Sequence, residues 1–70
     1  MKKEKFEIEG EYIELIQLLK ALNIAETGGQ AKMMVDDGEV KLNGETEHRK
    51  RAKLRKGDVV EVNAHKIELV

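Results

Sequence analysis

Apolar residues change their spacing along this chain from every second position to every third or fourth, and back again. Over residues 11–22 they recur at three- and four-residue steps, which places them on one face of a helix. This stripe consists of Tyr12, Leu15, Ile16, Leu19 and Leu22. Lys20 in the last turn suits the helix dipole, and Asn23 is a suitable residue to end the helix. We therefore predict a first helix over residues 11–22.

A second helix is predicted to begin at Thr27-Gly28-Gly29-Gln30. Threonine followed three residues later by glutamine is a capping-box pattern, in which side chains bond the free backbone amides of the first turn. Gly38 is expected to end this helix because glycine readily adopts the left-handed conformation found there. The predicted core residues are Ala31, Met34 and Val35, with Met33 in or near the core.

The remaining apolar residues alternate with polar ones, which is typical of half-buried strands. Phe6 and Ile8 predict a short strand over residues 6–9, and later strands are expected at residues 40–42, 46–50, 60–62 and 67–69. Asn43-Gly44 favours a type I′ hairpin turn, since both central residues of that turn need positive φ. Turns are also expected at residues 56–58 and 63–66. The prediction is an α+β fold: two helices packed on a small, mainly antiparallel sheet of four or five short strands.

Size and composition limit the classes of protein to which the chain can belong. Seventy residues form at most one domain, which we place at residues 1–70. The sequence contains no cysteine, which excludes disulfides and thiolate metal sites. No apolar run approaches the ~18 residues that span a bilayer. We therefore expect a cytoplasmic protein with no membrane segment and no cofactor.

Positive charge is concentrated in one stretch. Six of the eight residues from Arg49 to Lys56 are Lys or Arg, although the whole chain has a net charge of −1. Residues 1–47 carry six basic and eleven acidic side chains. A local reversal of sign favours a polyanionic partner. The alternative is a solvated charged loop that balances the acidic remainder.

Other candidate sites give weaker signals. Gly28-Gly29 at a helix N-terminus can bind a phosphate, with Lys32 one turn further on. A tight turn between closely packed helices, or simple capping, explains the same glycines, and the alternatives stay open here. His48 and His65 lack the further ligands that a metal site needs, so we assign His48 to the basic stretch and His65 to a turn. Asp36-Asp37 has no neighbouring nucleophile, and no enzyme activity is predicted.

An ordered set of short motifs follows residue 26. Its elements are Thr27, Gln30-Ala31-Lys32, Met34-Val35, Gly38, Val40, Leu42-Asn43-Gly44, the basic stretch and Gly57-Asp58. In this order they resemble the RNA-binding domain named after ribosomal small-subunit protein S-four. The match covers about two-thirds of the chain, and the small size and the GGQAK segment resemble the stand-alone, ribosome-associated bacterial members.

The resemblance implies an alpha-L RNA-binding motif, with RNA lying across the second helix and the following hairpin. It implies a non-enzymatic protein that binds structured RNA, expected to be ribosomal RNA or a ribosome precursor, as a monomer that also contacts the ribosome or an assembly factor. The RNA-binding residues that the resemblance implies are Lys32, Arg49, Lys50, Arg51 and Lys53. From the residues themselves we add His48, which extends the basic stretch, and Thr27 to Gln30 as a candidate phosphate-binding helix N-terminus. Gly28, where many members are basic, and the acidic Asp36 and Asp37 weaken the helix half of this surface.

Strand geometry divides the basic stretch between two sides. If residues 46–50 and their continuation form a strand, Ala52 and Leu54 face inward. Arg49, Arg51 and Lys53 would then share one side, with His48 and Lys50 opposite, while Arg55 and Lys56 act as loop charges. Phe6 and Tyr12 are the only aromatic residues, and both are expected in or near the core. RNA would then be bound through phosphates and shape, without a stacking platform for bases.

A second hypothesis is an adaptor that binds protein. An acidic face of Glu7, Glu9, Glu11 and Glu14 would contact a basic ribosomal or replication protein.

Overall fold

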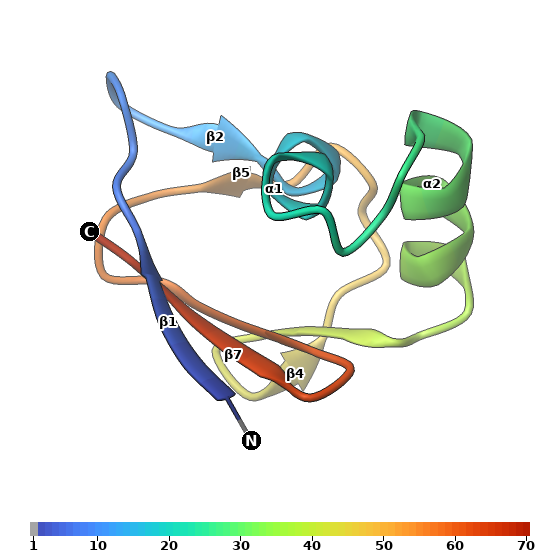
Figure 1. The fold of residues 1–70 in the computed structure, drawn as a ribbon. Helices are drawn as coiled ribbons and strands as arrows, with labels where there is room; N and C mark the ends of the chain where they lie inside the picture. The colour runs from blue at the N-terminus through green and yellow to red at the C-terminus, as the bar shows by residue number, and fades with distance from the viewer. Residues whose placement is uncertain (1) are drawn as a thin grey trace.

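Two helices lie over one face of a five-stranded sheet in the computed structural model, which describes residues 2–70 (Figure 1). The helices are α1 (Leu15–Ala21) and α2 (Gly28–Asp36). The strands are β1 (Lys2–Phe6), β2 (Ile13–Glu14), β3 (Val40–Leu42), β4 (Glu45–Thr46), β5 (Lys53–Leu54), β6 (Val59–Val62) and β7 (His65–Leu69).

The main sheet has the strand order β1-β7-β6-β3-β4 and is antiparallel except for the β1–β7 pair, which is parallel. This confirms the predicted α+β class with a mainly antiparallel sheet. A separate two-stranded antiparallel ribbon of β2 and β5 was not predicted.

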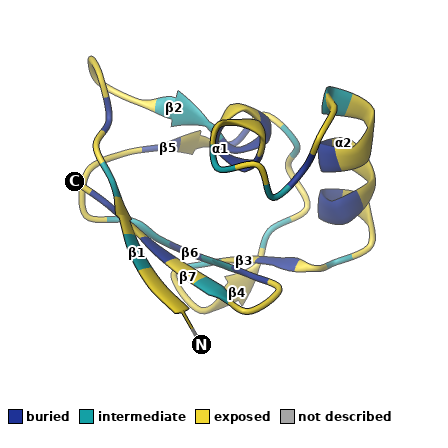
Figure 2. Cartoon of the chain, in the orientation of Figure 1, coloured by how far each residue is buried: buried dark blue, intermediate teal, exposed yellow. Residues whose placement is uncertain are grey.

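The core lies between the helices and the inner face of the sheet (Figure 2). Leu15, Leu18 and Leu19 of α1 are completely buried, and so are alternate residues of β6 and β7. Removing a leucine or valine side chain from water stabilises a fold by about 1.5–3 kcal/mol, so this layer holds the domain together. The predicted core face of α2, made of Ala31, Met34 and Val35, is confirmed, whereas Met33 is 64% exposed and the prediction for it was wrong.

The first helix is shorter than predicted. It begins at Leu15 instead of residue 11, because Ile13 and Glu14 form a strand that pairs with Leu54 and Lys53. The backbone amide of Leu15 donates to the Ala52 carbonyl at 2.9 Å, which fixes the point where strand becomes helix. The expected end is confirmed: Asn23 has the positive φ of +58° that closes a helix.

The N-terminal strand covers residues 2–6 rather than 6–9. Its register pairs Lys2 with His65 and Phe6 with Leu69. Ile8 lies beyond the strand but is buried, and its amide donates to the Val70 carbonyl at 2.8 Å. His65 is therefore the first residue of a strand and not a turn residue, and its Nδ1 lies 2.6 Å from Glu4 Oε2.

The predicted type I′ turn is confirmed, with φ of +52° at Asn43 and +87° at Gly44. The returning strand, however, ends at Thr46 instead of residue 50. After Glu47, whose amide donates to the Val40 carbonyl at 2.9 Å, the chain leaves the sheet to reach β5. We call residues 47–52 the basic loop. Within the described part of the chain, no helix is long and apolar enough to cross a membrane.

Candidate nucleic-acid interface

The basic loop joins β4 to β5 and passes the ends of both helices on its way (Figure 1). It starts at β4 and passes the C-terminal end of α2, where a Cβ on Gly38 would lie 3.7 Å from His48 Cε1. A turn follows, closed by the Ala52 amide donating to the Arg49 carbonyl at 3.2 Å. The loop ends beside the N-terminus of α1. Four of the six predicted RNA-binding residues, His48 to Arg51, thus lie on one connected segment, and Lys53 follows it on β5.

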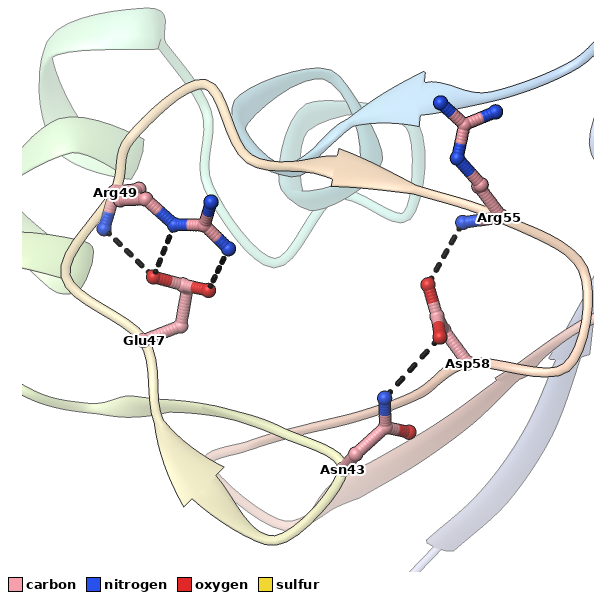
Figure 3. Close-up of polar contacts among 5 residues, drawn as sticks. All are labelled: Asn43, Glu47, Arg49, Arg55 and Asp58. Atoms are coloured by element: carbon pink, nitrogen blue, oxygen red, sulfur yellow. Dashed lines mark hydrogen bonds and ion pairs between the residues drawn. The ribbon is translucent and has the colours of Figure 1, made fainter.

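Arg49 folds back onto Glu47 within the loop (Figure 3). Its Nε and Nη2 donate to the two carboxylate oxygens at 3.1 and 2.9 Å, and its backbone amide donates to Oε2 at 3.0 Å. Three charge-assisted hydrogen bonds stabilise the ionised carboxylate, so the pKa of Glu47 lies below its usual value. The same contact raises the pKa of Arg49. The Arg49 side chain remains 76% exposed, while the Glu47 side chain is only 13% exposed.

Two further ion pairs attach the loop to the helices. Lys50 Nζ lies 3.2 Å from Asp36 Oδ2 at the end of α2. Arg51 Nε and Nη2 lie 3.4 and 3.5 Å from the Glu14 carboxylate at the start of α1. Exposed pairs of this kind contribute about 0–1 kcal/mol each, so they orient the loop more than they stabilise the fold. Glu14 is therefore engaged internally, whereas the other residues of the predicted acidic face, Glu7, Glu9 and Glu11, are exposed.

The predicted division of the basic stretch by strand alternation was wrong for residues 48–51. These residues form a loop and a turn, so no strand aligns Arg49 and Arg51 with Lys53. The prediction holds where the chain becomes β5: Ala52 and Leu54 are buried, and Lys53 between them is exposed. Lys50, expected opposite Arg49, instead reaches α2.

Thr27 caps the N-terminus of α2 as predicted, but the capping box is not complete, because the Gln30 side chain accepts from the Glu26 amide instead of the Thr27 amide. The Gln30 amide donates to Thr27 Oγ1 at 3.1 Å, and Gln30 Oε1 accepts from the Glu26 amide at 2.8 Å. A Cβ added to Gly28 would meet open space, so close helix packing does not require glycine there. With a rise of 1.5 Å per residue, this N-terminus lies about 12 Å along the helix from Asp36. Exposed Lys32 lies between the two ends, so the helix terminus and the basic loop are separate regions of the surface.

Sequence reasoning missed an exposed aromatic residue beside the loop. Tyr12 is 40% exposed, and the prediction that it lies in or near the core was wrong. Lys53 Nζ and Arg55 Cζ lie 5.0 and 5.9 Å from the centroid of its ring. We call these three residues the tyrosine platform. The only local sequence feature that pointed to an exposed Tyr12 was Gly10, two residues before it. The pairing of β2 with β5, which places Tyr12 at the surface, depends on residues about 40 positions apart.

Two of the sequence motifs, Asn43-Gly44 and Gly57-Asp58, are joined beside Arg55 by hydrogen bonds of Asn43 and Asp58 (Figure 3). Asn43 Nδ2 donates to Asp58 Oδ1 at 3.1 Å, and the Arg55 amide donates to Asp58 Oδ2 at 2.8 Å. Asn43 Oδ1 also accepts from the Val59 amide at 2.9 Å. Asn43-Gly44 and Gly57-Asp58 therefore have a structural role: together they fix the hairpin and the end of β5.

The fold and these contacts can be compared with known proteins. The model of the S4 domain matches residues 6–70. The chain belongs to the S4 domain family. The alpha-L fold expected for an S4 domain is also confirmed by the solution structure of YbcJ from Escherichia coli, which superposes with a TM-score of 0.71 at 36% identity. That comparison covers 94% of this chain and 85% of YbcJ, whose structure is described as revealing an alpha-L motif involved in RNA binding.

Curated relatives of this S4 domain protein carry related names. It is 39% identical over 59 residues to Escherichia coli YbcJ, named provisionally as an RNA-binding protein, with 84% of each chain covered. It is 42% identical over 55 residues to RlbA of Bacillus subtilis, named provisionally as a ribosome maturation protein; this covers 79% of the chain and 78% of RlbA. Among residues 2–70, no group of three or more His, Asp or Glu side chains is arranged to hold a metal ion.

Proposed function

We propose that this S4 domain protein binds structured RNA without catalysing a reaction, and that the RNA is ribosomal RNA or a ribosome precursor in the cytoplasm. Residues 1–70 act as one RNA-binding domain. The observation that carries the proposal is the run of five cations from Arg49 to Arg55, exposed except for the half-buried Lys50, on a chain that is otherwise acidic. Family membership and the names of YbcJ and RlbA support the same assignment.

The basic loop contacts RNA phosphates through Arg49, Lys50 and Arg51. The arginine guanidinium is planar and can bind two phosphate oxygens at once, and both arginine side chains are more than three-quarters exposed. Their carboxylate partners keep the loop in one shape before RNA arrives. A phosphate then has to compete with Glu47, Asp36 and Glu14, which favours sites with several phosphates in the right arrangement over any isolated anion.

The surface extends from the loop in both directions. Lys53 lies on β5, and Lys32 and His48 add positive or hydrogen-bonding groups toward α2. With about four phosphate contacts, the logarithm of affinity should fall with the logarithm of salt concentration at a slope of roughly −3, from the single-strand coefficient. The N-terminus of α2, from Thr27 to Gln30, is a secondary phosphate contact in this proposal.

The test is a filter-binding salt series with a structured ribosomal RNA fragment. Arg49→Ala/Arg51→Ala should weaken binding at low salt and flatten the salt slope by a little over one unit, since two phosphate contacts are lost. Lys3→Ala/Lys66→Ala is the matched control: it removes the same charge from two residues paired in β1 and β7, at the opposite edge of the sheet from β4. An unchanged slope in the arginine variant would remove the basic loop from the interface.

The identity of the RNA needs a separate experiment. Crosslinking in cells followed by sequencing of the bound RNA should recover ribosomal RNA or its precursors. Enrichment of an unrelated RNA class would support RNA binding but contradict the assignment to ribosomal RNA. Absence of any enriched RNA, together with recovery of one basic protein partner, would instead favour the adaptor hypothesis.

A further inference from the structure

The position of Tyr12 is set by the segment between β1 and β2. Gly10, with φ of +83°, turns the chain just before it. Ile13 then pairs with Leu54, which is buried. As a result, the phenol ring lies against β5 with 40% of the residue exposed, instead of facing the core.

Two cations lie over this ring and cover part of it, and 40% of Tyr12 stays exposed. Lys53 and Arg55 are two positions apart, flanking the inward-facing Leu54, so both project from the outer side of this segment. Both lie within the ~6 Å at which a cation is attracted to an aromatic ring. Of the ion pairs within residues 2–70, none involves either residue. A phosphate can therefore contact these two cations without displacing a carboxylate, whereas it competes with one at each cation of the basic loop.

Tyr12 also borders a surface hollow that is lined by apolar and acidic side chains and, among the described residues, by no lysine or arginine. The hollow has a volume of about 260 Å³ and is lined by Phe6, Glu7, Glu9, Tyr12, Ile13 and Gln17. Its aromatic and aliphatic side chains suit the flat face of a base. Its carboxylates can accept hydrogen bonds from the amino and imino groups of a base, and they repel a phosphate. This arrangement of charges favours a nucleotide with its base toward the hollow and its phosphate toward β5.

We propose that the tyrosine platform binds one unpaired nucleotide of the RNA, whose base stacks on the part of Tyr12 that Lys53 and Arg55 leave exposed while its phosphate contacts these two cations. This inference rests on the proposed function and replaces the sequence-based expectation that no base is stacked. It also gives the interface two parts: the basic loop contacts helical phosphates, and the adjoining platform takes a nucleotide from a flanking single strand. Stacking on an aromatic ring tolerates any base, so the platform detects unpaired structure more than sequence.

The experiment uses three probes: a short RNA duplex with a single-stranded overhang, the same duplex with blunt ends, and the duplex with abasic nucleotides in the overhang. Wild type should bind the overhang probe about 5- to 150-fold more tightly than the abasic one, the range for one base stacked on an aromatic residue. Tyr12→Leu should lose this preference, whereas Tyr12→Phe should keep it. Lys53→Ala/Arg55→Ala should weaken binding to both overhang probes.

A second readout reports on the site directly. The chain has one tyrosine and no tryptophan, so its intrinsic fluorescence comes from Tyr12. The intact overhang should quench this emission, while the blunt and abasic probes should not. Met33→Ala, which truncates an exposed apolar residue on α2, is the control and should behave as wild type.

Equal affinity of wild type for the intact and abasic overhangs would overturn the inference, and so would a Tyr12→Leu variant that retains the preference. If binding to the blunt duplex persists in either case, the proposed function stands without the platform. If wild type binds none of the three probes at low salt, both the platform inference and the proposed RNA-binding function are overturned.

Discussion

The basic loop and the tyrosine platform adjoin along residues 47–55, yet their cations have different neighbours. In the loop, each of Arg49, Lys50 and Arg51 has a carboxylate within ion-pair distance. In the platform, Lys53 and Arg55 lie beside an aromatic ring. The loop has more positive charge, but more of that charge is already compensated within the protein.

This difference shows that charge density along a sequence does not equal charge available to a ligand. Partnered cations are oriented before binding and exchange one anion for another, which favours a defined arrangement of phosphates. Cations that lie over part of an aromatic ring offer an anion site next to the part of the ring that stays exposed. The following predictions separate the two regions.

The largest effect is expected at Leu54, because this buried side chain supports both the basic loop and the tyrosine platform. Leu54 is completely buried between the loop and Arg55. Leu54→Ala should lower the free energy of unfolding by about 2–5 kcal/mol, through lost burial and a residual cavity. Urea unfolding measures this, with exposed Met33→Ala as the control that should change little. A Leu54→Ala variant as stable as wild type would show that β5 does not support these regions.

A second substitution should act on the platform side. Asp58 accepts hydrogen bonds from the Arg55 amide and the Asn43 side chain. Asp58→Ala should destabilise the fold by about 1–3 kcal/mol, because it removes two hydrogen bonds that contribute about 0.5–1.5 kcal/mol each. It should also weaken binding to an RNA overhang more than to a blunt duplex. An equal loss for both probes would mean that the two regions are not separable in this way.

Removing a carboxylate that competes with RNA for a cation of the basic loop should raise RNA affinity instead of lowering it. Asp36→Asn frees Lys50 and should raise RNA affinity by roughly 1.5- to 5-fold, the equivalent of one exposed ion pair. Asp37→Asn is a close control, since it removes the same charge from the adjacent residue without breaking an observed ion pair. Equal gains in the two variants would attribute the effect to general electrostatics instead of the Lys50–Asp36 contact.

The smallest effect concerns the pH dependence of the loop. The pKa of Glu47 is lower in the folded protein than its usual 4.5, because Arg49 donates hydrogen bonds to it. Its contribution to stability is therefore present above pH 4.5 and lost as the pH falls through the lower, folded pKa. Thermal unfolding of wild type and Glu47→Gln should differ near neutral pH and converge in acid. A constant difference down to strongly acidic pH would contradict this role of Glu47.

The elements that could be predicted from the sequence depend on near neighbours. Thr27 caps α2 through a contact with a residue three positions away, Asn43-Gly44 determines its own turn, and alternation gave most of β3, β6 and β7 correctly. Such features are fixed by backbone preferences and by hydrogen bonds within one turn.

The parts that could not be predicted depend on distant residues. The helical spacing of apolar residues continues back to Tyr12, but β5 competes for Ile13 and Glu14 and converts them to a strand. The same pairing draws residues 47–52 away from the main sheet and brings Glu14 to Arg51. For the candidate site, the sequence identified the basic residues but not their carboxylate partners, and it missed the exposure of Tyr12.

The most direct test of the RNA-binding surface is crosslinking of bound RNA to the protein, followed by mass spectrometry of the crosslinked peptides. The RNA should carry photoreactive nucleotides both in a helix and in a flanking single strand. We predict that helix crosslinks fall in the basic loop and that single-strand crosslinks fall at Tyr12 or on β5. Crosslinks confined to β1 and β7, around Lys3 and Lys66, would contradict the account.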